Sequence, residues 1–230
     1  HCVCESRKLT GKIQSFATDM LIDAYPGGLR VKDKQGNLPL HSAIERGDVV
    51  NLRVLKKMIE LHPEACKVKD KDGNTPLHSA CECRTKDLPV LVKQLLSVDP
   101  QGVAAKTKDR QGNLPIHSAA EKKNPSADVV TMLIDANPKG LEQKDRDGNL
   151  PIHSCLENRF DFPTSLFEKM LTLYPASTKV FDKDGNLPLH CAYHSYQGQQ
   201  LVDITQLMLQ VDSSAGVVKD KRFRQYLLHY

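Results

Sequence analysis

A nine-residue signature, Asp-x-x-Gly-Asn-(Leu/Thr)-Pro-(Leu/Ile)-His, constrains the fold of this chain more than any other feature, because it occurs five times. The copies run from Asp33 to His41, Asp70 to His78, Asp109 to His117, Asp145 to His153 and Asp182 to His190. Successive histidines lie 37, 39, 36 and 37 residues apart. Self-similarity at a period of about 20–50 residues is typical of a solenoid, in which copies of one supersecondary unit stack on each other. We therefore predict a single repeat domain over residues 1–230.

The spacing also predicts where the repeats begin and end. Full repeats are expected at about 33–69, 70–108, 109–144, 145–181 and 182–219, with a partial repeat at 1–32 and a degenerate partial repeat at 220–230. Solenoids need terminal repeats with polar outer faces, and neither end of this chain reads as such a cap. We interpret the chain as a piece of a longer array, and the alternative is a mature chain with atypical ends. Missing caps would leave the first helix pair frayed and favour end-to-end self-association.

The residues of one repeat indicate its local structure. Gly36 lies in a polar turn, at a position where the backbone needs a positive φ. Pro39 opens a short helix, because the first helical turn tolerates a missing N–H, and the residues that follow it form one apolar stripe. A second helix over residues 50–61 is apolar on a wide face and is expected to be sandwiched between neighbours. Pro63 ends that helix, and an extended return leads to the next copy of the signature.

Composition excludes several classes of protein. Hydrophobic residues make up 40% of the chain and charged residues 26%, and every apolar run is far shorter than a membrane span. We therefore expect no membrane insertion. The net charge of +4 is small, and basic residues alternate with acidic ones, so that no basic stripe forms. Nucleic-acid binding, which favours such a stripe, is not expected.

Cysteine usage predicts a reducing compartment. The chain has seven cysteines, at Cys2, Cys4, Cys66, Cys81, Cys83, Cys155 and Cys191. An odd number scattered through a repeat lattice is not a disulfide framework. The Cys-x-Cys pairs lack the two-residue spacer of structural zinc sites. We interpret the cysteines as small buried thiols in a cytoplasmic or nuclear protein.

The segment 73–80, Gly-Asn-Thr-Pro-Leu-His-Ser-Ala, resembles the ankyrin repeat, and five copies in register extend the resemblance over essentially the whole chain. The resemblance implies an all-α solenoid of helix–turn–helix pairs with short β-turn or hairpin projections. Two departures are present. The repeats are longer than usual, with the extra residues expected between the helices or in the second helix. Leucine also replaces the threonine before proline in four copies, at Leu38, Leu114, Leu150 and Leu187.

The motif histidines are candidate metal ligands, but a structural role is favoured. In four copies a glutamate follows the histidine by four residues, and in the last copy His194 follows His190, so that each pair shares a helix face. A metal site needs at least three converging ligands, and repetition in every layer indicates architecture. The resemblance implies that His41, His78, His117, His153 and His190 connect neighbouring turns through backbone hydrogen bonds. We expect no cofactor, no metal and no enzymatic activity, because neither a nucleophile motif nor a phosphate loop is present.

The resemblance also implies a partner-binding groove, formed by the projecting turns and the exposed end of each first helix. By position, its residues are Lys34, Gln35, Asn37, Glu45, Arg46, Lys71, Asp72, Asn74, Glu82, Cys83, Arg110, Gln111, Asn113, Glu121, Lys122, Arg146, Asp147, Asn149, Glu157, Asn158, Lys183, Asp184, Asn186, His194 and Ser195. We expect a polar, extended ligand such as a peptide tail, selected by charge. The alternative is that so uniform a groove binds nothing tightly. The last repeat differs, with Tyr193, His194 and Tyr196 as a candidate hot spot.

The leading hypothesis for function is therefore a non-catalytic scaffold that binds another protein or peptide. A second hypothesis is a regulatory or targeting region of a larger enzyme, such as a kinase or a ubiquitin ligase. A third is a structural spacer without a specific ligand, and a metalloenzyme is a distant fourth.

Overall fold

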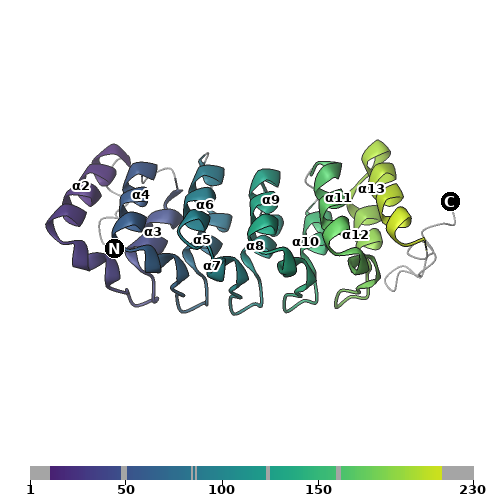
Figure 1. The fold of residues 1–230 in the computed structure, drawn as a ribbon, viewed down its shortest axis with the longest axis horizontal. Coiled ribbons are helices and arrows are strands. Elements are labelled where there is room, and N and C mark those ends of the chain that lie inside the picture. The colour runs from purple at the N-terminus through teal and green to yellow at the C-terminus, as the bar shows by residue number, and fades with distance from the viewer. Residues whose placement is uncertain are drawn as a thin grey trace. The chain divides into compact units, whose positions relative to one another are not determined.

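The structure is a computed structural model, and it describes residues 11–47, 51–83, 85, 87–122, 125–158 and 162–213, without the side chains of residues 11–14. These residues form helices joined by turns, and no β-strand occurs among them, so the expected all-α fold is confirmed (Figure 1). The chain divides into two compact units, residues 1–110 and 111–230, and each is described by itself. The partial repeat motifs at 1–10 and 220–230 lie outside the described residues. Of the helix pair expected to be frayed, the first member also lies outside them, whereas the second is helical over Gly11–Ala24.

The first unit consists of paired helices. In chain order they are α2 (Gly11–Ala24), the 3-10 helix η1 (Pro26–Arg30), α3 (Pro39–Glu45), α4 (Leu52–Leu61), the 3-10 helix η3 (Pro63–Lys67), α5 (Pro76–Glu82), α6 (Leu88–Ser97) and the four-residue α7 (Val103–Lys106). The short helix α3 packs against α5, and the longer helix α4 packs between α2 and α6 (Figure 1). Like elements of successive repeats are therefore neighbours.

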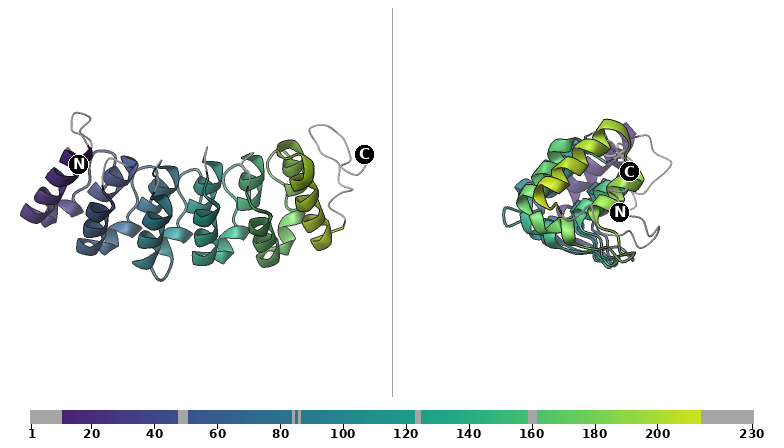
Figure 2. Two further views of the ribbon diagram at one scale, coloured as in Figure 1. Left: turned by 90° about the horizontal axis from the view of Figure 1, so that it is seen from above. Right: turned by 90° about the vertical axis from the view of Figure 1, so that its right-hand side faces the viewer.

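The second unit repeats this arrangement. Its helices are α8 (Pro115–Glu121), α9 (Ala127–Ala136), the 3-10 helix η4 (Pro138–Glu142), α10 (Pro151–Glu157), α11 (Thr164–Leu173), the 3-10 helix η5 (Pro175–Lys179), α12 (Pro188–Ser195) and α13 (Gly198–Val211). The short helices α8, α10 and α12 form one row, and the longer helices α9, α11 and α13 form another (Figure 2). Across both units, no helix in the described ranges has the length and apolarity needed to cross a membrane.

Each short helix begins where the motif predicts. In α3, Pro39 is the first helical residue and Leu38 is the N-cap. The predicted single apolar stripe is wrong, because every residue of α3 except Glu45 is buried. Burial of the polar residues is possible because the helix lies between neighbouring elements and its histidine is hydrogen-bonded.

The longer helices are only partly sandwiched. In α4, the buried residues are Val54, Leu55, Met58 and Ile59, whereas Leu61 is 46% exposed. The opposite side of α4 carries charged residues in contact with water. The wide buried face predicted for this helix is therefore narrower than its sequence suggests, and the helix is amphipathic.

The return from the long helix to the next turn is not extended, in contrast to the prediction. Pro63 opens the 3-10 helix η3, and the equivalent segments η1, η4 and η5 are also 3-10 helices that begin at a proline. In the 39-residue repeat, this return also has two additional residues, since Pro100 precedes Asp109 by nine positions and Pro63 precedes Asp70 by seven. The sequence instead predicted additional residues between the two helices or in the second helix. The additional residues form a turn through Gly102, which has a φ of +62°.

Candidate partner-binding groove

The recurring aspartate, glycine and asparagine of the signature shape the projecting turns. In the first turn, the Oδ1 atom of Asp33 accepts hydrogen bonds from the N–H groups of Gln35 and Asn37, at 2.9 and 2.8 Å. The main-chain N–H of Asp33 also donates to the carbonyl of Asn37, at 2.9 Å. Gly36 has a φ of +81°, as predicted. The aspartate and asparagine of each signature therefore build the loop that the groove residues occupy.

Backbone hydrogen bonds hold neighbouring turns in register. In the first unit, the N–H of Lys71 donates to the carbonyl of Gln35 at 2.9 Å. In the second unit, the N–H of Arg146 donates to the carbonyl of Gln111 at 2.9 Å, and that of Lys183 donates to the carbonyl of Asp147 at 3.0 Å. The side chains at the tips of the turns therefore project from a connected backbone ladder.

Lysine side chains form a second connection beside these turns. The Nζ atom of Lys32 donates to the carbonyl of Lys69 at 3.0 Å, and Lys69 donates in turn to the carbonyl of Lys108 at 2.8 Å. In the second unit, Lys144 donates to the carbonyl of Phe181 at 2.6 Å. Phe181 stands where the earlier repeats have lysine, so it accepts this bond but cannot continue the series with an ammonium of its own.

The histidine of the motif lies in the core, beneath the groove. The N–H of Leu38 donates to Nδ1 of His41 at 3.1 Å, so the ring proton resides on Nε2. That nitrogen faces the carbonyls of Val68 and Asn74, at 3.1 and 3.3 Å. Burial lowers the pKa of His41, against the opposing effects of Asp70 and the two carbonyls. The geometry of His41 agrees with the backbone-linking role that the family resemblance implies.

In the second unit, the motif histidines accept the same backbone bond at Nδ1. The N–H of Leu150 donates to Nδ1 of His153 at 3.1 Å, and the ring is fully buried. Burial lowers the pKa of His153 to about 4, although Asp182 and the backbone of Val180 and Asn186 favour the charged ring. His153 is therefore neutral at physiological pH.

The threonine variant of the motif adds one contact. The Oγ1 atom of Thr75 lies 2.9 Å from Nδ1 of His78, which also accepts from the N–H of Thr75 at 3.2 Å. The Leu-Pro copies keep the backbone bond and lose the hydroxyl, as expected.

Charges at the tips of the turns are partly paired along the groove. Arg110 lies 3.7 Å from Asp72 in the first unit, and Lys183 lies 2.8 Å from Asp147 in the second. The neighbours of Lys71 and Arg146 differ. Their N–H groups bond to Gln35 and Gln111, which occupy the position that aspartate holds at Asp72 and Asp147. The structure therefore distinguishes groove positions that look alike in the sequence.

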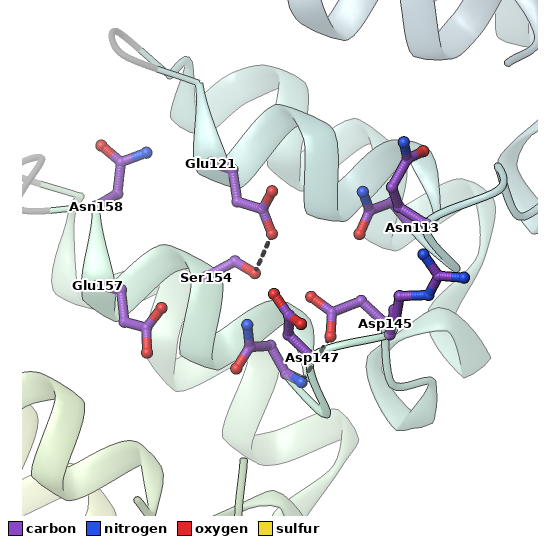
Figure 3. Close-up of a pocket in the computed structure, with 10 residues that line it drawn as sticks. Asn113, Glu121, Asp145, Asp147, Ser154, Glu157 and Asn158 are labelled. Carbon is purple, nitrogen blue, oxygen red and sulfur yellow. Dashed lines mark hydrogen bonds between the residues drawn. The ribbon is translucent and has the colours of Figure 1, made fainter. Parts of the chain in front are cut away.

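A pocket of about 480 Å³ lies within the second unit, on the predicted groove (Figure 3). It is formed by α8, α10 and the turns at residues 111–113 and 145–149. Its lining residues are Gln111, Asn113, Glu121, Asp145, Arg146, Asp147, Asn149, Ser154, Glu157 and Asn158. Eight of these ten were predicted as groove residues from the sequence. Asp145 and Ser154 were not.

The pocket is acidic and internally organised. Its lining contains four carboxylates, from Glu121, Asp145, Asp147 and Glu157, against the single guanidinium of Arg146. The hydroxyl of Ser154 donates to Oε1 of Glu121 at 3.1 Å (Figure 3). The pKa of Glu157 is raised by partial burial and by the negative charges of nearby aspartates. This surface disfavours further negative charge and is electrostatically suited to a cation.

Some predicted groove residues have structural positions instead. Cys83 and Asn186 are buried, with exposures of 6% and 8%, so neither presents its side chain at the surface. The amide of Asn186 donates to Oδ2 of Asp182 at 3.0 Å. Asn158 donates to the carbonyls of Ala120 and Lys122, the latter at 2.9 Å, and so caps the end of α8. The remaining predicted residues are exposed or partly exposed.

The predicted hot spot in the last repeat is wrong for one of its three members. Tyr196 is 5% exposed, packs edge-to-face on Phe167 at 6.2 Å between ring centroids, and donates its hydroxyl to the carbonyl of Cys155 at 3.3 Å. It is a core residue. Tyr193 and His194 are exposed, with their rings 6.2 Å apart.

The potential metal ligands that come together differ from those considered in the sequence. Within the described residues, one group of three lies close together, namely Glu157, Asp182 and Cys191. The thiol of Cys191 donates to Oε1 of Glu157 at 3.6 Å, and burial raises the pKa of that thiol. Asp182 accepts two bonds from Asn186. These residues are already hydrogen-bonded to protein groups, with the thiol in its protonated form. His190 and His194 are not part of the group.

Ser154, one of the two missed pocket residues, carried a signal in the sequence. Ser154 follows the motif histidine, in a slot that holds serine in four copies and Cys191 in the last. Both residues donate to the glutamate of the preceding repeat, Glu121 or Glu157. The recurrence of a small donor beside the histidine therefore indicated a contact between repeats.

Comparisons with known proteins agree with this architecture. A family model described as ankyrin repeats (3 copies) matches residues 15–91 and 51–142, more than half of the chain. No curated protein matches the sequence significantly. Among solved structures, the ankyrin repeat domain of Bcl-3, described as a unique member of the IkappaB protein family, matches with 19% identity and a TM-score of 0.64 over 99% of this chain and 90% of that chain.

A second structural match is a chain from the complex of the Bd0816 predatory endopeptidase of Bdellovibrio bacteriovorus with immunity protein Bd3460. It has 16% identity and a TM-score of 0.62, over 82% of this chain and 90% of that chain. At these identities, both similarities establish the fold alone.

Proposed function

Because the chain belongs to the ankyrin-repeat family, as its sequence predicts, we propose that it is a non-catalytic protein-interaction module that binds a partner through the groove of turns and first helices. The pocket in the second unit carries this proposal, since eight of its ten lining residues occupy predicted groove positions. Ankyrin repeats generally mediate protein interactions. The Bd0816 structure is itself that of a complex between two proteins.

The geometry suits an extended ligand. The turns are connected by backbone bonds, so they offer a preorganised row of polar side chains and lose little conformational freedom on binding. The motif histidines are buried and take no direct part.

An affinity purification with three baits tests the proposal. The baits are the wild-type chain, a groove variant with Glu121→Lys and Glu157→Lys, and a control variant with Glu142→Lys and Glu168→Lys. Both variants change the net charge equally, and neither Glu142 nor Glu168 lines the pocket. Thermal melts followed by circular dichroism establish that all three are folded. Captured proteins are identified by mass spectrometry, purified, and titrated against each bait by calorimetry.

We expect a partner that binds the wild type and the control but not the groove variant. A partner that binds all three equally would place the interface elsewhere and contradict the groove proposal. Capture of nothing by any bait would favour a structural spacer.

A further inference from the structure

The charge of the pocket is opposite in sign to that of the whole chain. The chain carries a net charge of +4, whereas the pocket lining carries four acidic side chains and one basic one. Asp147 is paired with Lys183 at 2.8 Å, so Glu121, Asp145 and Glu157 supply the remaining negative charge against Arg146. A concave site lined by one sign of charge focuses the field and attracts ligands of the other sign. The partner surface that enters this pocket is therefore expected to be cationic.

The carboxylates converge from different elements. Glu121 lies at the end of α8, whereas Asp145 and Asp147 lie in the turn before α10, and Figure 3 shows all three beside one central space. Oδ1 of Asp145 accepts from the N–H of Asn149 at 2.8 Å, which leaves its second oxygen for a ligand. Ser154, on α10 and 2% exposed, fixes one oxygen of Glu121 by its hydrogen bond. Acceptors that approach from several directions are suited to a donor with several fixed N–H groups.

Resting on the proposed function, we propose that this pocket receives an arginine side chain from an extended segment of the partner. A guanidinium has five N–H donors in a planar fork and pairs with carboxylates through two bonds at once, whereas an ammonium acts as a point charge. None of the described residues that line the pocket is aromatic, so these residues do not form the cage that recognises methylated lysine.

The neighbouring repeat supports a cationic ligand. Glu157 bears the same relation to Cys191 that Glu121 bears to Ser154, so the acidic row continues along the unit. The pKa of Glu157 is raised, first by desolvation and then by Asp182, Asp184 and Asp145. A bound cation would offset that repulsion and lower the pKa of Glu157.

The probe is the capped tripeptide acetyl-Gly-Arg-Gly-amide, compared with its lysine and citrulline analogues. Each is titrated into the ¹⁵N-labelled full chain and followed by NMR. We expect saturable shifts at Glu121, Ser154 and Glu157, with the arginine peptide binding several-fold more tightly than the lysine peptide. Citrulline keeps the shape of arginine without the charge and should not bind. Binding should weaken as ionic strength rises.

Two isosteric double variants test the site. Glu121→Gln with Glu157→Gln should weaken the arginine peptide by roughly tenfold, whereas Glu142→Gln with Glu168→Gln should bind like the wild type. Equal binding of arginine and citrulline, equal binding to both variants, or no saturable shift at millimolar peptide would overturn the inference. If a groove-dependent protein partner is nevertheless captured, the proposed function stands and only the arginine assignment fails.

Discussion

The Nε2 atom of His41 donates to the main-chain carbonyl of Val68 at 3.1 Å, 27 residues further along the chain. One side chain thus joins the short helix of one repeat to the residues that lead into the next turn. Its other ring nitrogen accepts from Leu38, so both nitrogens of the buried ring are satisfied. This relationship predicts a stability cost when the ring is removed.

His41→Ala should destabilise the protein by about 1–3 kcal/mol, because the substitution leaves buried backbone groups without their partner. The free energy of unfolding from urea titration measures this loss. The control is His62→Ala, since His62 is only partly buried at the end of α4. An equal effect of the two substitutions would contradict the linking role of His41.

Stability should also depend on pH through His153. Its folded-state pKa of about 4 lies below the ordinary value of 6.5, because burial disfavours the charged ring. The folded chain therefore holds the ring neutral, whereas the unfolded chain takes up a proton as pH falls. This contribution is fully present above pH 6.5 and is lost as pH falls toward 4, a loss of roughly 3 kcal/mol.

Urea titrations across that pH range check the sign and the size of the effect. His153→Gln should be less stable than the wild type at neutral pH but should lose less stability on acidification. Parallel pH profiles for the two proteins would mean that His153 does not contribute to the dependence.

The positions of the turns and the starts of the short helices were predictable, because the residues that determine them are local in sequence. Pro39 needs no hydrogen-bond partner at the first helical position, and Gly36 has the positive φ that the turn requires. The burial of α3 was not predictable in the same way. By polarity alone, His41 and Ser42 look like surface residues, and the family resemblance indicated an inward position only for His41. The buried ring of His41 contacts the carbonyl of Asn74 in the next repeat, which local sequence does not encode.

The position of the candidate pocket was predictable, but the predicted set of lining residues was incomplete. Family resemblance placed Glu121 and Glu157 on the groove, but Ser154 was not among the predicted groove residues. The burial of Tyr196 depends on Phe167, which lies 29 residues earlier in α11, and no local pattern encodes that contact. The predictions therefore failed where a residue's position depends on contacts between elements that are distant in sequence.

Replacing a turn glycine by alanine should destabilise the protein more than the same substitution at a glycine with a similar φ outside the turns. Gly148 has a φ of +78°, and an added Cβ would lie 3.1 Å from the backbone nitrogen of Lys183. Gly198 has a φ of +61° with nothing within 4 Å of the same atom. Both substitutions should cost about 1 kcal/mol from strain, and Gly148→Ala should cost more because it also separates neighbouring turns. Equal melting temperatures for the two variants would contradict this comparison.

The buried cysteines should be unreactive until the protein unfolds. Burial raises the pKa of Cys66 to about 12, and burial raises the pKa values of Cys155 and Cys191 well above the ordinary 9.0. Because the thiolate is the reactive form, these thiols should react with Ellman's reagent only in denaturant. Cys2 and Cys4 lie outside the described residues, so the measurement uses a variant with serine at both positions. Rapid labelling of that variant without denaturant would show that the burial is not maintained in solution.

Ser154 should act as a positioning residue for the proposed arginine site. Ser154→Ala leaves every charge in place but removes the donor to Glu121, so the carboxylate loses its fixed orientation. We expect several-fold weaker binding of acetyl-Gly-Arg-Gly-amide, together with a stability loss of about 1 kcal/mol. The matched variant is Ser154→Cys, because Cys191 already makes the equivalent bond to Glu157.

A thiol is a weaker donor than a hydroxyl, so the cysteine variant should bind with an affinity between those of the wild type and the alanine variant. A purely structural role for Ser154 would lower stability without changing the preference for arginine over lysine. Orientation of Glu121 predicts that this preference falls as well, because two-bond recognition of a guanidinium depends on the angle of the carboxylate. The ratio of the two peptide affinities in each folded variant therefore separates positioning from packing, and an unchanged ratio in Ser154→Ala would contradict the positioning role.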